Sequence, residues 1–389
     1  MSSEAVEDAY FSTNPPPRNL DSHITQAQDF IASHAAANRR VVLLTSGGTT
    51  VPLERQTVRF IDNFSAGTRG ATSAEYFLAA GYAVIFLHRE FSLVPYVRHW
   101  SHTTTGGFLD FLEVDDGAGS VRPRANVNAK MTEVLKLYRR ARDENLLLTI
   151  PFVTIGDYLH ELRALSHLLS PLGPNALLYL AAAVSDFFVP PERMSEHKIQ
   201  STDMAALAAA AAAAEGGGTS TPANGEEEFD NFDATPKVAR SKRLVVDLDP
   251  VPKFLKNLVD GWAPQGMIAS YKLETDPSIL VHKARHSLGR YQHHLVIGNL
   301  LATRKWEVVF VSPGREDHWL RVSRKRRDGG EGDGWGEEEV KQLRAGEVPK
   351  DEEPESEIEA LIIPAVRELH DAHIEQTRKK QKASESSTA

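Results

Sequence analysis

The stretch TSGGTTVPLERQTVRFIDNFSAGTRG, residues 45–70, places two glycine clusters ahead of a helix rich in small residues. The start of a helix offers unpaired backbone N–H groups and a positive dipole end, and Gly67 and Gly70 would let a phosphate approach the backbone. The pattern predicts an anion cradle. It fits neither the dinucleotide fingerprint GxGxxG nor the GxxxxGK[ST] loop. Glycines that merely permit tight strand-to-helix turns explain the spacing equally well.

Polar side chains flank this stretch and follow a second apolar run. Arg59 and Asn63 precede the later glycines, and an arginine near phosphates neutralises charge through paired hydrogen bonds. Asp186 follows the run 176–183, whose alanines leave room for a ligand against the backbone. The alternatives are an ordinary loop arginine and an aspartate that caps a helix or a turn.

Further polar positions come at the ends of other apolar runs. Lys198 lies in the polar segment EHKI, from which it could reach a phosphate or stabilise a developing negative charge. Tyr271 and Lys272 end the run 266–271, a combination suited to a base or ribose beside a phosphate, and Asn299 follows the next run. Each alone is explained as a solvated loop residue. Several in one chain indicate a shared ligand site.

These positions depend on a predicted framework in which strands alternate with helices. Apolar runs predict buried parallel strands at 41–44, 83–87, 176–183, 266–271 and 295–297. Helical spacing predicts helices at 24–31, 70–80, 127–145, 155–169, 252–259, 279–291 and 358–373. The alternation indicates an α/β fold: a doubly wound, Rossmann-like, mainly parallel sheet with helices on both faces and ligands beyond the carboxyl ends of its strands.

Composition excludes several classes of protein. The chain has 389 residues and no cysteine, which excludes disulfides, zinc–thiolate sites and a cysteine nucleophile. A formal net charge of -9 argues against nucleic acid as a partner. The sequence has neither a membrane-spanning apolar stretch nor a secretory leader. We therefore expect a cytoplasmic protein without a membrane partner, and the basic run 324–327 leaves a nuclear presence open.

Low-complexity segments divide the chain. An alanine run that leads into GGG and EEE, and later an acidic glycine-rich tract, cannot bury enough apolar area to order themselves. We expect an α/β domain formed by 21–311 plus 357–375, with a disordered insertion at about 203–235. We further expect a flexible leader at 1–20, a low-complexity insertion at 312–356 and a flexible tail at 376–389.

No metal ligands are assigned from the sequence. His282 and His286 lie four residues apart on a predicted helix, which is a spacing that could share a metal ion. They lack the HExxH context, so a solvated helix face is the favoured interpretation.

Four blocks of this sequence resemble the eukaryotic phosphopantothenate–cysteine ligases. They are TSGGTTVPLERQTVRFIDNFSAGTRGATSAEYFLAAGYAVIFLHR, LAAAVSDFFVPPERMSEHKIQS, SYKLETDP and VIGNLLATR. The likeness extends from about residue 40 to residue 310, apart from the alanine-rich and acidic insertion. It implies a ligase of coenzyme A synthesis that joins 4'-phosphopantothenate to L-cysteine through an acyl nucleotidylate.

The resemblance also implies roles for individual residues. Lys198 would stabilise charge while the acyl nucleotidylate forms, and Asn63 would orient that intermediate, so both are predicted to be catalytic. The residues that the resemblance assigns to the nucleotide are Gly47, Ser65, Gly67, Gly70, Tyr271 and Asn299. Lys272, which is predicted from its place beside Tyr271, completes the predicted nucleotide-binding residues. The predicted residues on the phosphopantothenate side are Arg59, Asn63, Ala182, Ala183 and Asp186.

The same resemblance implies a co-substrate and a quaternary structure. ATP or CTP would be consumed, with Mg²⁺ to neutralise the triphosphate, and the preference between the two nucleotides stays open. The family forms homodimers, so the resemblance implies a dimerisation element and two composite sites. Arg59 would then reach across the interface into the site of a second copy.

Two other functions stay open at this point. A nicotinamide-dependent oxidoreductase would use a similar Rossmann-like sheet, although the GxGxxG spacing is absent. A non-catalytic, nucleotide-binding regulatory subunit would keep the pocket and act through the disordered insertions.

Overall fold

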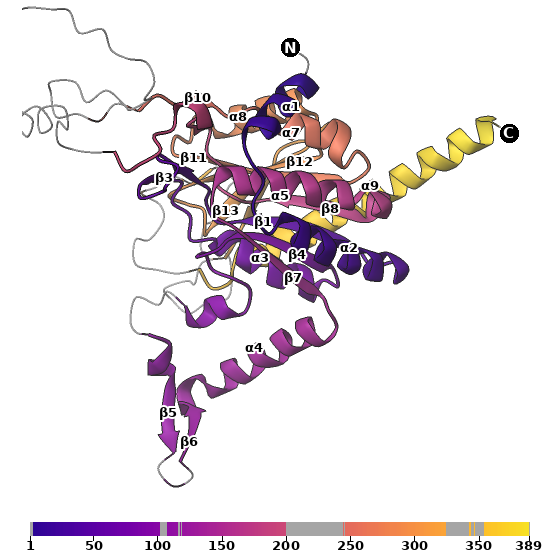
Figure 1. The fold of residues 1–389 in the computed structure, drawn as a ribbon. Coiled ribbons are helices and arrows are strands. Elements are labelled where there is room, and N and C mark those ends of the chain that lie inside the picture. The colour runs from indigo at the N-terminus through magenta and orange to yellow at the C-terminus, as the bar shows by residue number, and fades with distance from the viewer. Residues whose placement is uncertain are drawn as a thin grey trace, which may run out of the picture.

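Figure 1 shows the fold in a computed structural model of the protein. The structure describes residues 3–101, 107–115, 117, 119–199, 244, 246–323, 342–343, 346 and 354–388. The predicted insertion at about 203–235 lies outside the described residues, and so does most of the predicted insertion at 312–356.

A mixed, mainly parallel sheet of eight strands forms the centre of the fold. Along the sheet the order is β14-β13-β12-β11-β8-β1-β4-β7; β13 pairs antiparallel with both β12 and β14, and the other neighbouring strands pair in parallel. The strands are β1 (Val41–Ser46), β4 (Ala83–Arg89), β7 (Leu147–Phe152), β8 (Ala176–Leu180), β11 (Met267–Glu274), β12 (Leu295–Leu300), β13 (Glu307–Val311) and β14 (His318–Arg321). The predicted mainly parallel sheet is confirmed.

The direction in which the chain crosses the sheet reverses between β1 and β8. The chain runs from β1 through β4 to β7 at one edge, and then returns to β8, which pairs with the other side of β1. From β8 it continues through β11 to β12. Such a switch point leaves a crevice outside the carboxyl ends of the two strands, where doubly wound proteins bind ligands. The topology therefore predicts a ligand site beyond β1 and β8.

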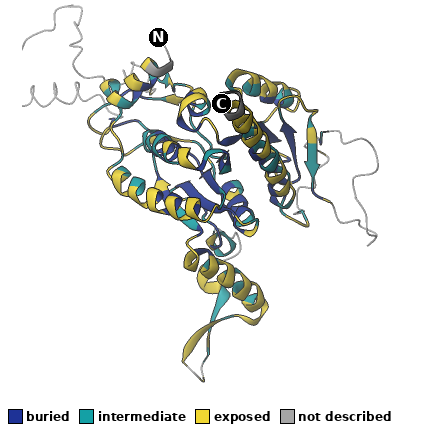
Figure 2. Cartoon of the chain, turned by 90° about the vertical axis from the view of Figure 1, so that its right-hand side faces the viewer, coloured by how far each residue is buried: buried dark blue, intermediate teal, exposed yellow. Residues whose placement is uncertain are grey.

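Helices cover both faces of the sheet (Figures 1 and 2), as predicted. The covering helices are α2 (Leu20–Ala36), α3 (Thr68–Ala79), α5 (Ile155–Leu168), α8 (Leu280–Tyr291) and α9 (Glu359–Thr388). Side chains alternate along a strand, so Leu43 of β1 packs toward α2 and α5, whereas Leu44 packs toward α3 and α9. Every residue of β1 is buried. Burial on both faces explains why this strand reads as a continuous apolar run.

Both ends of the chain differ from the prediction. Within the expected flexible leader, residues 3–13 form helix α1 (Ser3–Thr13), whose Tyr10 is buried against the rings of Phe188 and Phe254. The expected flexible tail instead continues α9 as far as Thr388. The docked aromatic ring of Tyr10 and the bonds from Glu7 to Arg163 and Trp262 hold α1 in place. The tail residues of α9 are mostly good helix formers. Among the described residues, no helix has the length and apolar character of a membrane span.

Other elements also differ from the prediction: β13 was not predicted, and β8 ends at Leu180 and not at residue 183. Strand β7 was not predicted because Pro151 interrupts its pattern, and proline is tolerated there because β7 is an edge strand. Strand β14 falls inside the expected low-complexity insertion, where Leu343 is also buried. In place of the predicted helix 252–259, the structure has the short α7 (Leu255–Asn257) and a π-helical turn, η5 (Leu258–Trp262).

An arm projects from the main body in both Figure 1 and Figure 2. It consists of the 3₁₀ turn η2 (Phe108–Phe111), the hairpin β5 (Leu112–Asp115) and β6 (Ser120–Pro123), and helix α4 (Ala125–Asp143). Within α4 only Ala141 is buried. Apolar side chains lie exposed along the arm, at Phe108, Leu109, Val114, Val121, Leu135 and Leu137. The sequence predicted α4 but not the hairpin.

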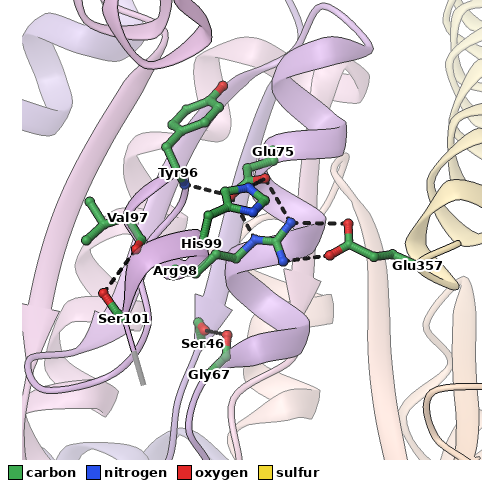
Figure 3. Close-up of polar contacts among 9 residues, drawn as sticks. All are labelled: Ser46, Gly67, Glu75, Tyr96, Val97, Arg98, His99, Ser101 and Glu357. Atoms are coloured by element: carbon green, nitrogen blue, oxygen red, sulfur yellow. Dashed lines mark hydrogen bonds and ion pairs between the residues drawn. The ribbon is translucent and has the colours of Figure 1, made fainter. Parts of the chain in front are cut away.

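A cluster of charged residues fastens the segment that leads into the arm (Figure 3). Arg98, in the 3₁₀ turn η1 (Val97–Trp100), forms ion pairs with Glu75 of α3 at 2.8 Å and with Glu357 at 2.6 Å. His99 Nε2 lies 3.0 Å from the second oxygen of Glu75. Burial raises the pKa of Glu75, but the hydrogen bonds from His99 and Arg98 outweigh it and hold that pKa below its usual value. The carboxylate therefore stays charged and ties the segment to α3.

Candidate functional site

The segments that follow β1 and β8 continue side by side beyond the end of the sheet. Ala183 N–H donates to the Gly47 carbonyl at 2.8 Å, and Thr49 N–H donates to the Ala183 carbonyl at 3.1 Å. Asn63 Nδ2 donates to the same Ala183 carbonyl at 3.2 Å. Gly48 and Ala183 form an isolated parallel bridge. We call this junction at the carboxyl ends of β1 and β8 the switch-point crevice; glycine and alanine build it, and Asn63 is bonded to it.

The first glycine pair is required by close packing. A Cβ on Gly48 would lie 1.8 Å from the carbonyl oxygen of Asn63, which is a backbone atom and cannot easily move. Gly47 has φ +83°, and a Cβ there would lie 2.7 Å from Cβ of Arg89. The two residues therefore serve the local fold whether or not a ligand approaches them.

The second glycine pair seats helix α3 on the end of β1. Gly67 precedes the helix in the left-handed region, and no side chain caps the helix start. Ser46 Oγ donates to the Gly67 carbonyl at 3.1 Å (Figure 3), and Ser65 Oγ accepts from Gly67 N–H at 3.4 Å. A Cβ on Gly70 would lie 2.2 Å from Ser46 Oγ. The N-terminus of α3 thus opens beside the crevice, an arrangement suited to an anion.

A cavity of about 340 Å³ adjoins the crevice, beside the carboxyl ends of β8 and β11. Its apolar wall comes from α5, α7 and η5, and includes Leu159, Leu162 and Leu258. Its polar lining residues are Ser185, Asp186, Lys253, Ser270, Lys272 and Ser287, with tyrosines at 158, 271 and 291. Ala182 also lines the cavity. An apolar enclosure with a few polar groups is the usual form of a small-molecule site.

Charged groups at the cavity are paired within the chain. Lys253 Nζ lies 2.7 Å from Asp186 Oδ1, and the Asp186 carbonyl accepts from Val251 N–H at 2.9 Å. The pairing of β9 (Phe187–Phe188) with β10 (Asp249–Pro250) holds these two segments together. Lys272 Nζ lies 3.5 Å from Glu274 Oε1. Asp186 is exposed, so a ligand can still reach its carboxylate.

Tyr271 directs its hydroxyl toward helix α3. Its oxygen lies 2.5 Å from the Tyr179 hydroxyl, which in turn lies 3.1 Å from Ser73 Oγ, and the Arg69 guanidinium stacks over the Tyr271 ring. Burial and the neighbouring Tyr179 raise the pKa of Tyr271 far above its usual value, so the phenol stays neutral. Asn299 lies on β12 two residues beyond Ile297, the register partner of Tyr271, and therefore shares its face of the sheet.

The sequence did not reveal a buried pair at the cavity. His293 Nε2 lies 2.8 Å from Ser270 Oγ, and Ser270 lines the cavity. Burial lowers the pKa of His293 to about 4, so the imidazole is neutral near pH 7. The contact joins the middle of β11 to the residues before β12. A serine within a strand and a histidine 23 residues later carry no spacing signal that predicts their meeting.

Arg59 and Lys198 lie apart from the crevice. They occupy the outer end of a hairpin formed by β2 (Thr50–Pro52) and β3 (Phe60–Asp62), and the loop beside it that follows the 3₁₀ turn η4 (Pro191–Arg193). Arg59 precedes Asn63 by four residues, roughly 13 Å along an extended strand. Lys198 is exposed in its loop. A single copy of the chain therefore groups the glycines, Asn63 and the alanines, but it does not bring Arg59 or Lys198 into the crevice.

Together the sheet order, the glycine-lined crevice and the adjoining cavity define a doubly wound α/β protein, a class whose members bind ligands at the switch point. Comparisons with known proteins agree. The chain is 48% identical over 322 residues to phosphopantothenate–cysteine ligase CAB2 of Saccharomyces cerevisiae, covering 82% of this chain and 81% of that protein. It is 41% identical over 295 residues to phosphopantothenate–cysteine ligase of Homo sapiens, covering 75% of this chain and 82% of that one.

Solved structures give the same result. A Cab2 variant solved in complex with phosphopantothenate-cysteine superposes with a TM-score of 0.73 at 43% sequence identity, covering 95% of this chain and 99% of that one. No family model matches the sequence. At these identities and coverages, the chain belongs to the phosphopantothenate–cysteine ligase family, a family of coenzyme A synthesis. Membership sets aside the oxidoreductase alternative.

Proposed function

We propose that this chain forms the amide bond between 4'-phosphopantothenate and L-cysteine at the expense of a nucleoside triphosphate. The observation that supports this most is the convergence of three features at one switch point: the uncapped start of α3, the crevice at Gly47 and Ala183, and the cavity beside Asp186. They offer an anion site, a close backbone approach and an enclosure for an apolar or aromatic group. A nucleotide joined to an acid needs all three.

The proposed ligation has two steps. A carboxylate oxygen of phosphopantothenate attacks the α-phosphorus of the nucleotide, which forms an acyl nucleotidylate and releases pyrophosphate. The amine of cysteine then attacks the acyl carbon, loses a proton and displaces the nucleoside monophosphate. Lys198 stabilises the charge of the first step, and Asn63, fixed through the Ala183 carbonyl, orients the intermediate. Positioned charge of this kind is the main protein contribution to phosphoryl and nucleotidyl transfer.

We propose ATP or CTP as the co-substrate, with Mg²⁺ entering as part of the nucleotide complex. Among the described residues, no group of three or more His, Cys, Asp or Glu side chains could hold a metal ion. Magnesium is commonly bound by substrate phosphates and one or two carboxylates, so such a group is not required. We also propose a cytoplasmic location, on the compositional grounds given above.

A product analysis tests the proposed reaction. The purified protein is incubated with phosphopantothenate, cysteine, Mg²⁺ and either ATP or CTP, and the phosphorus-containing products are separated. Pyrophosphate and the nucleoside monophosphate should appear in equal amounts with the amide product. Formation of a nucleoside diphosphate and inorganic phosphate would instead indicate an acyl phosphate, and would contradict the proposed intermediate.

We also propose that the protein works as a homodimer. The arm exposes a line of apolar side chains, and Val58, Phe60, Ile61 and Phe64 of the β2–β3 region are exposed as well. Exposed apolar groups concentrated on projecting elements are typical of interaction surfaces. A second copy seated there would contact the outer end of the hairpin, which carries Arg59. This arrangement explains why one chain alone leaves Arg59 outside its own crevice.

Subunit complementation tests the composite site. Arg59→Ala and Asn63→Ala variants are unfolded together, mixed in equal amounts and refolded. If Arg59 of one copy serves the crevice that holds Asn63 of the other, mixed dimers contain one intact site, and about a quarter of wild-type activity returns. Activity no higher than that of either variant alone would show that both residues serve the site of their own chain.

A second variant tests the arm as the dimer surface. The double variant Leu109→Asp, Val121→Asp places charges on the arm and should be monomeric by light scattering.

A further inference from the structure

Glu54 is a fully buried carboxylate at the outer end of the β2–β3 hairpin, and it lies outside both the crevice and the cavity. Its Oε2 accepts from the backbone N–H of Arg59 at 2.9 Å and of Val58 at 3.3 Å. Its Oε1 accepts from Arg59 Nη1 at 3.1 Å and from Ile199 N–H at 3.3 Å. Both oxygens are therefore saturated by donors from two separate segments.

The second of these segments carries Lys198. Its earlier part is held by backbone contacts, because Arg55 N–H donates to the Ser195 carbonyl at 2.9 Å and Glu54 forms a bridge with Ser195. Its later part is held by side chains: Ile199 N–H donates to Glu54, and the Ile199 carbonyl accepts from Arg59 Nη1 at 2.7 Å. Lys198 thus lies between two fixed points, and the later one depends on Glu54 and Arg59.

Charge makes Glu54 suited to this task. Burial raises its pKa, but the hydrogen bonds from Arg59, Ile199 and Val58 outweigh burial and hold that pKa below the usual value. A carboxylate accepts from several donors at once and donates none, whereas an amide in the same place would turn an N–H toward donors. The position of Glu54 therefore requires a charged acceptor.

We propose that Glu54 is a positioning residue for the ligation reaction, holding Lys198 and Arg59 in one fixed arrangement at the outer end of the hairpin. This inference rests on the proposed function, because Lys198 and Arg59 take their chemical roles from it. Glu54 itself touches no substrate. Its contribution passes through the backbone of Ile199, next to Lys198, and through the Arg59 guanidinium.

The test uses Glu54→Gln in the full-length chain. The turnover number kcat for pyrophosphate release should fall by about 10- to 100-fold, as expected when a reactive group is misplaced by about 1 Å. KM for the nucleotide should change far less, because the crevice and the cavity are untouched. In a Lys198→Ala background the same substitution should lower kcat by a smaller factor than it does alone, because the part of its effect that passes through Lys198 is already lost.

A matched control separates positioning from general destabilisation. Glu307 is also buried, and it accepts from the Arg321 guanidinium and from Leu343 N–H at the opposite side of the sheet. Glu307→Gln should keep kcat within about 2-fold of the wild type at temperatures where it stays folded. Equal loss of kcat in the two variants, or additive losses in the double variant with Lys198→Ala, would overturn the inference.

Hydrogen exchange supplies a readout that does not depend on activity. Peptides covering residues 195–199 should exchange faster in Glu54→Gln than in the wild type, because Ile199 N–H loses its acceptor. Faster exchange with unchanged kcat would overturn the positioning role alone. A wild-type protein that forms no pyrophosphate would overturn the proposed function, and this inference with it.

Discussion

The crevice and the outer end of the hairpin are held by different means. Backbone hydrogen bonds join Gly47, Thr49 and Ala183 in the crevice, and no side chain larger than that of Asn63 takes part. At the hairpin end, the carboxylate of Glu54 and the guanidinium of Arg59 fasten two loops to each other. The first region tolerates no added atoms. The second depends on the charges of Glu54 and Arg59.

The difference follows from position in the fold. The crevice lies at the ends of two adjacent parallel strands, where the sheet itself supplies geometry and only small residues fit. Among the described residues, the hairpin end pairs with another strand segment only through the isolated bridge between Glu54 and Ser195. It therefore needs specific side chains to replace the hydrogen bonds of a sheet. Substitutions in the two regions should accordingly fail in different ways.

The largest effect is expected for Gly48→Ala. The new methyl group would lie 1.8 Å from the Asn63 carbonyl oxygen, so the hairpin backbone must shift. We expect a loss of about 3 kcal/mol in the free energy of unfolding, measured by urea denaturation, because overpacking against backbone is relieved only by moving it. A loss below about 1 kcal/mol would show that the backbone of the crevice moves aside more easily than its contacts indicate.

Arg59→Ala should lower the free energy of unfolding by less, about 2 kcal/mol in urea denaturation, because Glu54 keeps its backbone donors after losing the guanidinium.

The contribution of Glu54 to stability should depend on pH. The pKa of Glu54 is held below its ordinary 4.5 in the folded protein. Its stabilising contribution is therefore present above pH 4.5 and is lost as pH falls through the folded-state pKa. Denaturation midpoints of wild type and Glu54→Gln should converge on acidification; a constant gap would contradict this assignment.

Asn63→Ala should affect stability least among the site variants, by about 1 kcal/mol, because one neutral hydrogen bond to the Ala183 carbonyl is lost. Its kinetic effect should be much larger than its effect on folding. Thermal melts and steady-state rates on the same samples check both. A large drop in stability with little change in kcat would place Asn63 in the fold and not in the chemistry.

Gly289→Ala provides the reference for these glycine changes. Gly289 lies inside α8 with nothing within 4 Å of an added Cβ. Alanine there should raise the free energy of unfolding by up to about 1 kcal/mol, since glycine disfavours a helix interior. A destabilisation would contradict the view that the crevice glycines are special because of what surrounds them.

The sequence revealed the crevice better than the hairpin end. An apolar run that ends in small residues indicates where a parallel strand stops, and a glycine before a small-residue run indicates where a helix begins, so the positions of Gly47, Ala183 and Gly67 followed from local pattern. Glu54 meets Ile199 across 145 residues, and Ser270 meets His293 across 23. Such contacts leave no periodic trace in one sequence. Helix α1 was missed for a related reason: Tyr10 finds its partners, Phe188 and Phe254, only after the chain has folded.

The roles of Asn63 and Lys198 came from family resemblance and stay predictions. Local spacing identified Asn63 only as a neighbour of the glycines. The structure places it against Ala183, which strengthens its assignment to the crevice. Lys198 lies at the other region, so its role depends on how a second copy, or a bound substrate, meets the hairpin.

A single-turnover experiment tests the central claim most directly. Enzyme in excess is mixed with phosphopantothenate and nucleotide labelled in the γ-phosphate, with Mg²⁺ and without cysteine, and labelled pyrophosphate is followed over time. The account predicts that pyrophosphate forms without cysteine at a rate at least as fast as overall turnover, and that Lys198→Ala slows its formation. Pyrophosphate that appears only after cysteine is added would show that the switch-point crevice does not activate the acid by nucleotidyl transfer, and would contradict the account.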